Sequence, residues 1–171
     1  KFIYPGVGYG GSCFPKDVAA LRSFGRTVGE QTRMLDAVLD INTDQPLRMV
    51  ALLEKELSLA GKTVAVLGLA FKPGTDDLRE SPALPLVAEL RKKGAKVLVH
   101  DPIAMPHAKK RPEFRDVVFA EDWAEALRKS DACCLVTAWP EYRNIQPNNF
   151  QKLMTRALVI DGRGVFEPAA M

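Results

Sequence analysis

The chain has 171 residues, of which 47% are hydrophobic, so it is long enough for about one domain with a buried core. Charged residues make up 26%, and 12 Gly plus 12 Pro are too few for a collagen-like or disordered chain. The net charge is +3, with acidic and basic residues interleaved, which argues against a dedicated nucleic-acid binder. The densest basic stretch, Lys109-Lys110-Arg111 with Arg115, is interpreted as a solvated loop.

No apolar run reaches the roughly 18 residues of a membrane span, and no charged segment followed by an apolar one resembles a secretory signal. We therefore expect no membrane partner. Three cysteines, two of them adjacent, do not make a disulfide framework, so a reducing, cytoplasmic setting is expected. Because the sequence starts at Lys1 rather than Met and reaches a glycine-rich loop at Gly6, we expect a fragment whose N-terminal part has been removed.

Residues 1–14 are predicted to be irregular and to end in a glycine-rich turn over Gly6–Ser12. Pro15 suits the first position of a helix, where its missing N–H costs nothing, and this helix should reach about Gly25.

A second helical pattern extends from Glu30 to Leu57, with apolar residues at helical spacing. Pro46 interrupts it, which predicts a kink or two helices meeting near Asp44. This amphipathic stretch is a candidate surface for pairing with another subunit. Packing against its own domain fits the pattern equally well.

The rest of the chain alternates short apolar runs with helical ones. Strands are predicted over residues 63–69, 96–100, 117–120, 132–137 and 157–161, and helices over 82–93, 122–129 and 150–154. Strands that are apolar on both faces and alternate with helices indicate a parallel sheet covered on both sides. The predicted fold is α/β, with a Rossmann-like sheet domain over residues 61–171 preceded by a helical segment over residues 1–60.

Cys13 is the most informative single residue. It lies between a loop with four glycines and a helix that starts near Pro15, so its thiol meets the positive end of the helix dipole. Lys16 is three residues away, and both effects favour the nucleophilic thiolate. Asp17, one helical turn on, could orient water or accept a proton. A lone cysteine would be interpreted as a buried core residue, but this combination of neighbours favours a reactive one.

Two long motifs carry a resemblance to a known family. Residues 6–17 read GVGYGGSCFPKD, and residues 68–82 read GLAFKPGTDDLRESP. The first resembles the catalytic loop, and the second the nucleotide-sugar loop, of the UDP-glucose/GDP-mannose dehydrogenase family. The resemblance covers essentially the whole chain, but only about the second half of a family member. The amino-acid sequences of both motifs most resemble those of family members that act on UDP-glucose.

The resemblance implies an activity. Family members oxidise the C6 alcohol of a nucleotide sugar to a carboxylate in two hydride transfers to NAD. A cysteine thiolate holds the intermediate aldehyde covalently between the two oxidations. In family members, a catalytic Glu belongs to an N-terminal dinucleotide-binding domain, and a catalytic Lys and Asn belong to the helix that follows it. None of these lies in this sequence. We therefore expect the chain alone to be inactive.

The resemblance also implies roles for individual residues. Cys13 matches the nucleophile and Asp17 the acid that positions water, while Lys16 and Arg79 match residues beside the cofactor. The residues that match substrate contacts are Tyr4, Gly6, Gly8, Tyr9, Gly10, Phe71, Lys72 and Arg163. A homodimer through the central helices is expected, and no metal is, because His100 and His107 lack metal-ligand neighbours.

Several alternatives stay open. GDP-mannose could replace UDP-glucose as the substrate. The isolated chain could act as a nucleotide-sugar-binding and dimerising module without activity. A cysteine hydrolase that pairs Cys13 with His100 or His107 has no support in the spacing. Asp101 could imitate the acid that binds a dinucleotide ribose, although Asp-Pro is also a common turn, which we favour. Cys133 and Cys134 are interpreted as small core residues.

Overall fold

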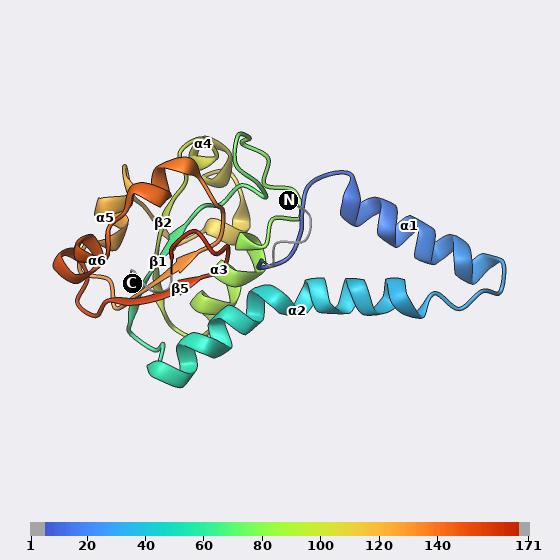
Figure 1. Cartoon of the computed structure of the whole chain (residues 1–171), viewed down its shortest axis with the longest axis horizontal. Coiled ribbons are helices and arrows are strands. Elements are labelled where there is room, and N and C mark those ends of the chain that lie inside the picture. The colour runs from blue at the N-terminus through green and yellow to red at the C-terminus, as the bar shows by residue number, and fades with distance from the viewer. Residues whose placement is uncertain (1–5, 168–171) are drawn as a thin grey trace.

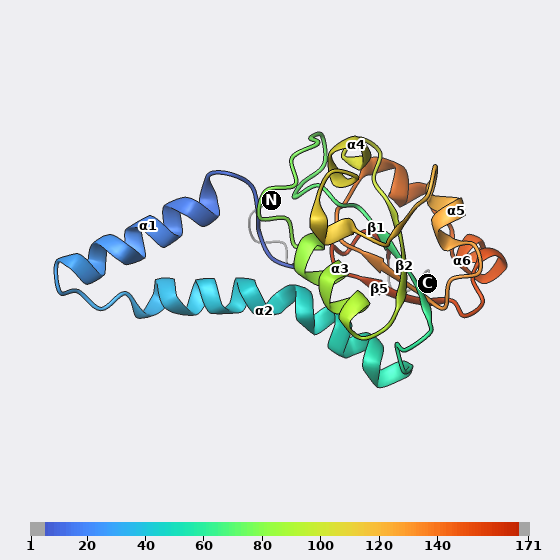
Figure 2. The ribbon, with the colours of Figure 1, turned by 180° about the vertical axis from the view of Figure 1, so that it is seen from behind.

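The computed structural model of the chain describes residues 6–167. Figure 1 shows an α/β body from which a hairpin of two helices projects. The hairpin consists of α1 (Phe14–Thr27) and α2 (Arg33–Glu56). Seen from behind, Figure 2 shows α1 lying along the outer part of α2, away from the sheet, while the inner part of α2 packs on the body.

The body is built on five strands, all parallel, in the order β3-β2-β1-β4-β5. The strands are β1 (Thr63–Leu67), β2 (Lys96–His100), β3 (Val118–Phe119), β4 (Ala132–Leu135) and β5 (Leu158–Asp161). Val66 of the central strand is in register with Val99 of β2 and Cys134 of β4. The predicted α/β fold with a parallel, Rossmann-like sheet is therefore confirmed. Each predicted strand is present, with ends that differ by a few residues at most.

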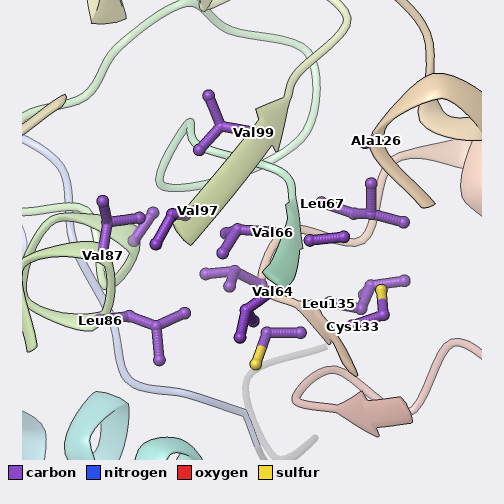
Figure 3. Close-up of a cluster of buried hydrophobic side chains, with 14 of the residues drawn as sticks. Val64, Val66, Leu67, Leu86, Val87, Val97, Val99, Ala126, Cys133 and Leu135 are labelled. Atoms are coloured by element: carbon purple, nitrogen blue, oxygen red, sulfur yellow. The ribbon is translucent and has the colours of Figure 1, made fainter. Parts of the chain in front are cut away.

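Helices cover both faces of the sheet. They are α3 (Ala83–Lys92), α4 (Met105–Ala108), α5 (Trp123–Leu127) and α6 (Pro147–Leu153), with 3-10 turns at Pro112–Phe114 and Pro140–Asn144. Figure 3 shows Leu86 and Val87 of α3 approaching the strands from one side and Ala126 of α5 from the other. These side chains are fully buried, as are residues 64–67 of β1 and all of β4, which explains why β1 and β4 read as continuous apolar runs.

Local capping explains several helix ends. The Asp122 carboxylate accepts a hydrogen bond from the Glu125 N–H (2.7 Å) and so caps α5. The Glu125 carboxylate in turn accepts from the N–H of Glu121 rather than from that of the cap residue. The α3 helix ends before Gly94, which has φ +81°, a conformation that glycine adopts without strain. α4 and the two 3-10 turns were not predicted.

The path of α2 corrects one expectation. It is a single helix through Pro46, not two helices meeting near Asp44. It changes direction part-way along its length (Figure 1). Pro46 has no N–H to donate to the carbonyl of Asn42, and its ring crowds that carbonyl, so a bend at this turn is expected.

Burial beyond the proline explains why the helix continues. The next two turns place Met49, Val50 and Leu53 in the core, with exposures of 4%, 2% and 0%. Burying one such side chain contributes about 1.5–3 kcal/mol. Together they offset the roughly 3 kcal/mol that a proline costs inside a helix.

The outer part of the hairpin is held by polar contacts and leaves apolar side chains exposed. The Arg26 guanidinium donates to the Asp36 carboxylate (3.0 Å) and so links α1 to α2. Exposed apolar side chains of this outer part are Phe14, Leu21, Phe24, Val28, Met34 and Ile41. Pairing with a second subunit through these helices stays a prediction.

Candidate active site

The glycine-rich loop lies between α2 and the loop that follows β1. The Gly11 N–H donates to the carbonyl of Arg79 (2.8 Å), which joins the two sequence motifs directly. A Cβ on Gly10 would overlap the carbonyl of Glu80, and one on Gly11 would lie 2.7 Å from the Phe71 ring. Glycine is therefore needed at both positions, because the loop lies directly on the Glu80 backbone and on the Phe71 ring.

Cys13 lies at the end of this loop, as the N-cap residue of α1, and it is exposed. Pro15 lies in the first turn, and the Asp17 N–H donates to the carbonyl of Cys13 (2.9 Å). The predicted placement of the sulfur at the positive end of a helix is therefore present. The neighbouring Ser12 hydroxyl is 3.7 Å from the sulfur.

Two cations lie within electrostatic reach of Cys13. The Lys16 ammonium is 3.1 Å from the Asp17 carboxylate, and both side chains are exposed. That hydrogen bond and its charge raise the pKa of Lys16, with a smaller contribution from Cys13. The pKa of Arg79 is raised chiefly by its hydrogen bonds to Asp77 and, again in smaller part, by Cys13. Each of these two cations is also paired with a carboxylate of its own, Asp17 or Asp77.

The loop after β1 presents its polar side chains outward. The Lys72 ammonium lies 5.3 Å from the centre of the Phe71 ring. The Arg79 guanidinium makes a bidentate contact with the Asp77 carboxylate, with its Nη2 2.8 Å from Oδ2, and its side chain remains 65% exposed. This contact holds the pKa of Asp77 below its usual range. Asp77 therefore fixes the direction of Arg79, which leaves N–H donors free for an anion.

Arg163 lies at the carboxyl end of β5 and reaches under the start of the glycine loop. Its Nε donates to the carbonyl of Val136 (2.6 Å), and a Cβ on Gly6 would lie 2.5 Å from its Nη1. Burial lowers its pKa. Asp161 shapes this turn by accepting the N–H groups of Arg163, Val165 and Phe166. Arg163 therefore supports the loop from the sheet side.

Two hollows adjoin the loop and share Asn42, Thr43, Arg79 and Glu80 as walls. One, of about 500 Å³, is also lined by Gly11, Ser12, Pro15, Lys16, Ala19 and Leu39. The other, of about 420 Å³, is also lined by Tyr9, Ser81, Pro82, Leu84, Pro85, Arg111, Glu113 and Pro46. The Glu80 backbone between them has φ +52°, which is a strained conformation for a residue other than glycine.

Most of the predicted site residues thus gather around one loop. Tyr9, Gly10, Lys16 and Arg79 adjoin the hollows or the contact between the motifs. Gly6 and Gly8 continue the loop toward Arg163 and α2. Phe71 packs on the loop, and Lys72 packs on Phe71. Tyr4 lies outside the described residues.

Asp101 is a structural residue and not a free ribose-binding acid. It is 1% exposed, and its Oδ2 accepts the N–H groups of Leu69 and Ala70 and the indole N–H of Trp139. Its Oδ1 accepts the N–H groups of Ile103 and Ala104. The favoured turn interpretation is confirmed. A carboxylate with five internal donors has no capacity left for a ribose hydroxyl.

The remaining titratable candidates do not form a second site. Cys133 and Cys134 are fully buried in β4, and burial raises the pKa of Cys134 to about 12. His100 is hydrogen-bonded to the Tyr142 hydroxyl (3.0 Å), and burial lowers its pKa. Within residues 6–167 no group of three potential metal ligands comes together. Over the same residues, neither histidine is hydrogen-bonded to Cys13.

Sequence reasoning missed Asn42, Gln45 and Asp77. The Asn42 side chain bonds the backbone of Tyr9, and Gln45 donates to the carbonyl of Gly6. A signal was present for Asn42, because it occupies a position where the apolar stripe of the predicted helix calls for a hydrophobic residue. Asp77 has no comparable signal, since acidic residues are common in loops.

Comparison with known proteins matches both parts of the chain to one family. Residues 65–168 match the UDP binding domain of the UDP-glucose/GDP-mannose dehydrogenase family, and residues 1–44 match its central domain. The chain belongs to the UDP-glucose/GDP-mannose dehydrogenase family. Across residues 6–167 of this family member, no helix has the length and hydropathy that crossing a membrane requires.

Individual members of the family match nearly the whole chain. It is 44% identical to UDP-glucose 6-dehydrogenase AglM of Haloferax volcanii over 96% of its length, and 39% identical to UDP-glucose 6-dehydrogenase TuaD of Bacillus subtilis over 97%. A solved UDP-glucose dehydrogenase from Pyrobaculum islandicum superposes with a TM-score of 0.85 at 41% identity over 94% of the chain. The chain spans 37%, 36% and 35% of these three relatives, respectively.

Proposed function

We propose that this chain is part of an NAD-dependent UDP-glucose 6-dehydrogenase, which oxidises UDP-glucose to UDP-glucuronate in two steps. One observation carries the proposal: the glycine loop before Cys13 is hydrogen-bonded to the nucleotide-sugar loop after β1. Relatives that match almost all of the chain are named for this activity. Because the chain spans less than two-fifths of those relatives, we assign the activity to the full-length protein.

In this proposal Cys13 is the nucleophile. Oxidation of the C6 alcohol gives an aldehyde, and the Cys13 thiolate adds to its carbonyl carbon to form a thiohemiacetal. Loss of a second hydride from C6 gives a thioester. Water then attacks the thioester carbon, which releases the carboxylate and returns the thiolate. NAD, when bound, supplies the hydride acceptor, and each of the two oxidations uses one NAD molecule.

The exposed position of Cys13 at the start of α1 suits this role. The positive end of the helix and the nearby Lys16 and Arg79 would stabilise an oxyanion that forms beside the sulfur. Asp17, one turn along the same helix, is the proposed group that orients the attacking water.

The remaining residues of the site are proposed to bind the cofactor or the sugar nucleotide. Exposed Lys16 and Arg79 suit the anionic pyrophosphate of a dinucleotide. This fit supports a cofactor beside the glycine loop, whereas the saturated Asp101 argues against one at the centre of this sheet. The residues proposed to contact the sugar nucleotide are Gly6, Gly8, Tyr9, Gly10, Phe71, Lys72 and Arg163, together with Tyr4 from outside the described residues.

Turnover by the full-length protein tests the proposal. With UDP-glucose and NAD it should form two NADH for each UDP-glucose consumed, and Cys13→Ser should lower the rate by several orders of magnitude. Ser23→Ala, an exposed change on the same helix, is the matched control and should have no effect. Absence of NADH, or full activity of Cys13→Ser, would overturn the proposal. GDP-mannose in place of UDP-glucose separates the two family substrates.

A further inference from the structure

The α2 helix holds the glycine loop through side-chain amides. The carboxamide oxygen of Asn42 accepts the N–H of Tyr9 (2.7 Å), and the carboxamide nitrogen donates to the carbonyl of the same residue (3.1 Å). One helical turn on, the Gln45 amide donates to the carbonyl of Gly6 (3.4 Å). Asn42 therefore binds the loop as a neighbouring β-strand would, with one donor and one acceptor.

The fit between loop and helix is close. Gly8 has φ +107°, and a Cβ there would lie 2.8 Å from the Asn42 carboxamide oxygen and 3.4 Å from the Asn42 carbonyl. A side chain at position 8 would both strain the backbone and displace Asn42. The loop thus passes directly over the amide that holds it.

The turn of α2 that carries Asn42 and Gln45 leads into Pro46. Pro46 follows Asn42 by four residues and cannot donate to its carbonyl, so α2 lacks one backbone hydrogen bond at the turn that carries Asn42 and Gln45. Pro46 itself is buried and lines one of the two hollows. Beyond it, α2 is anchored in the core by Leu53, which is 0% exposed. The side-chain amides of Asn42 and Gln45 therefore belong to a helix that is anchored in the core beside the sheet.

The loop is fixed at its other end as well. The Gly11 N–H donates to the carbonyl of Arg79, and Cys13 follows two residues later as the helix cap. Contacts from α2 at Gly6 and Tyr9 and from the β1 loop at Gly11 leave little freedom for the backbone between them. Cys13 therefore follows a loop that is held on two sides.

We propose that Asn42 and Gln45 are positioning residues for the dehydrogenase reaction. They hold the backbone of residues 6–9 so that this loop presents its peptide groups, and Cys13, to the sugar nucleotide in one geometry. The inference rests on the proposed function. Asn42 touches neither the sulfur nor the reacting carbon, and acts through Tyr9 and the loop. A displacement of about 1 Å at a reacting group can cost on the order of a hundredfold in rate.

An isosteric substitution separates hydrogen bonding from shape. Asn42→Asp keeps the acceptor for the Tyr9 N–H but replaces the donor by a second oxygen, which faces the Tyr9 carbonyl. Asn42→Ala removes both bonds without adding charge. Asn148→Asp, on the exposed surface of α6, adds the same charge and is the matched control.

The experiment is done on the full-length protein with two measurements. Hydrogen exchange of the peptide that spans residues 6–12 should become at least tenfold faster in both Asn42 variants and stay unchanged in Asn148→Asp. In steady-state kinetics, kcat should fall between about tenfold and a hundredfold, and KM for UDP-glucose should rise, while KM for NAD changes by less than twofold. Gln45→Glu, which loses one long bond, should show a smaller change in the same directions.

Three outcomes would overturn the inference: unchanged exchange, faster exchange with kcat and KM within twofold of the wild type, or a loss of kcat matched by the same loss of folded protein. If an Asn42 variant does not fold, Gln45→Glu decides between these outcomes. Failure of the proposed function would look different, because the wild type itself would then form no NADH while the exchange measurement still tests the contact.

Discussion

Replacing Asp101 by asparagine should destabilise the α/β body strongly, because this carboxylate joins the loops after β1, β2 and β4. Its two oxygens accept five hydrogen bonds, at distances of 2.7, 2.8, 3.0, 3.0 and 3.0 Å. Asparagine has one oxygen and can keep the three donors from Leu69, Ala70 and Trp139. Its NH2 group then faces the N–H groups of Ile103 and Ala104, which lose their acceptor.

The magnitude follows from these two lost bonds. A hydrogen bond to a charged group contributes about 1.5–3 kcal/mol, which gives about 3–6 kcal/mol for two. A neutral side chain costs less to bury than a carboxylate, so we expect a value near the lower limit, about 3 kcal/mol. Against a typical total of about 5–15 kcal/mol, this is a large fraction of the stability of a domain.

Urea unfolding of the chain provides the assay. Asp101→Asn should lower the midpoint with little change in the slope, because the surface exposed on unfolding is the same. Asp40→Asn is the matched control, since Asp40 is exposed, and it should stay within about 0.5 kcal/mol of the wild type. A loss of less than 1 kcal/mol for Asp101→Asn would refute the argument that the carboxylate is needed to satisfy buried N–H groups.

Three other outcomes are expected. At pH 8 iodoacetamide should label native protein at Cys13 alone and denatured protein at all three cysteines, and mass spectrometry can distinguish the two results. Labelling of a second cysteine in native protein would contradict the burial of Cys133 and Cys134. Because burial lowers the folded-state pKa of His100, the unfolded chain binds more protons, so stability should fall as the pH drops below about 6.5. Urea unfolding at pH 7 and 5 should show that His100→Gln weakens this pH dependence. If the free energy of unfolding changed by the same amount between the two pH values in the variant and the wild type, His100 would be excluded as its source. Gly10→Ala should make the glycine loop exchange faster, since its Cβ overlaps a backbone carbonyl, whereas Gly61→Ala, with open space around it, should affect only local strain.

Local signals were sufficient for most of the fold. The apolar runs of β1 and β4 were predicted in place because their signal lies within a few residues. The cap at Asp122 and the glycine after α3 also act within a few residues. The four-residue helix α4 was not predicted, because it is too short to show an apolar period. The local rule for proline was misleading at Pro46, where burial further along α2 outweighs the broken hydrogen bond.

The site required more than local signals. Cys13, Lys16 and Asp17 could be identified because they are neighbours in the sequence. The contact between Asn42 and Tyr9 spans 33 residues, and that between Asp101 and Leu69 spans 32. Such partners are chosen by the fold, and sequence spacing alone does not reveal them. Only Asn42, a polar residue within the apolar stripe of the predicted helix, gave a sequence signal for one of these contacts.

The adjacent cysteines of β4 have a practical consequence for experiments on assembly. Neighbouring residues in a strand point to opposite faces of the sheet, so the sulfurs of Cys133 and Cys134 are separated by the backbone and shielded by different layers. Air oxidation can therefore reach one thiol per molecule, Cys13. A band of doubled mass on a gel run without reductant would report two molecules cross-linked through that sulfur, and not a native dimer, so any study of subunit number needs a reducing agent throughout.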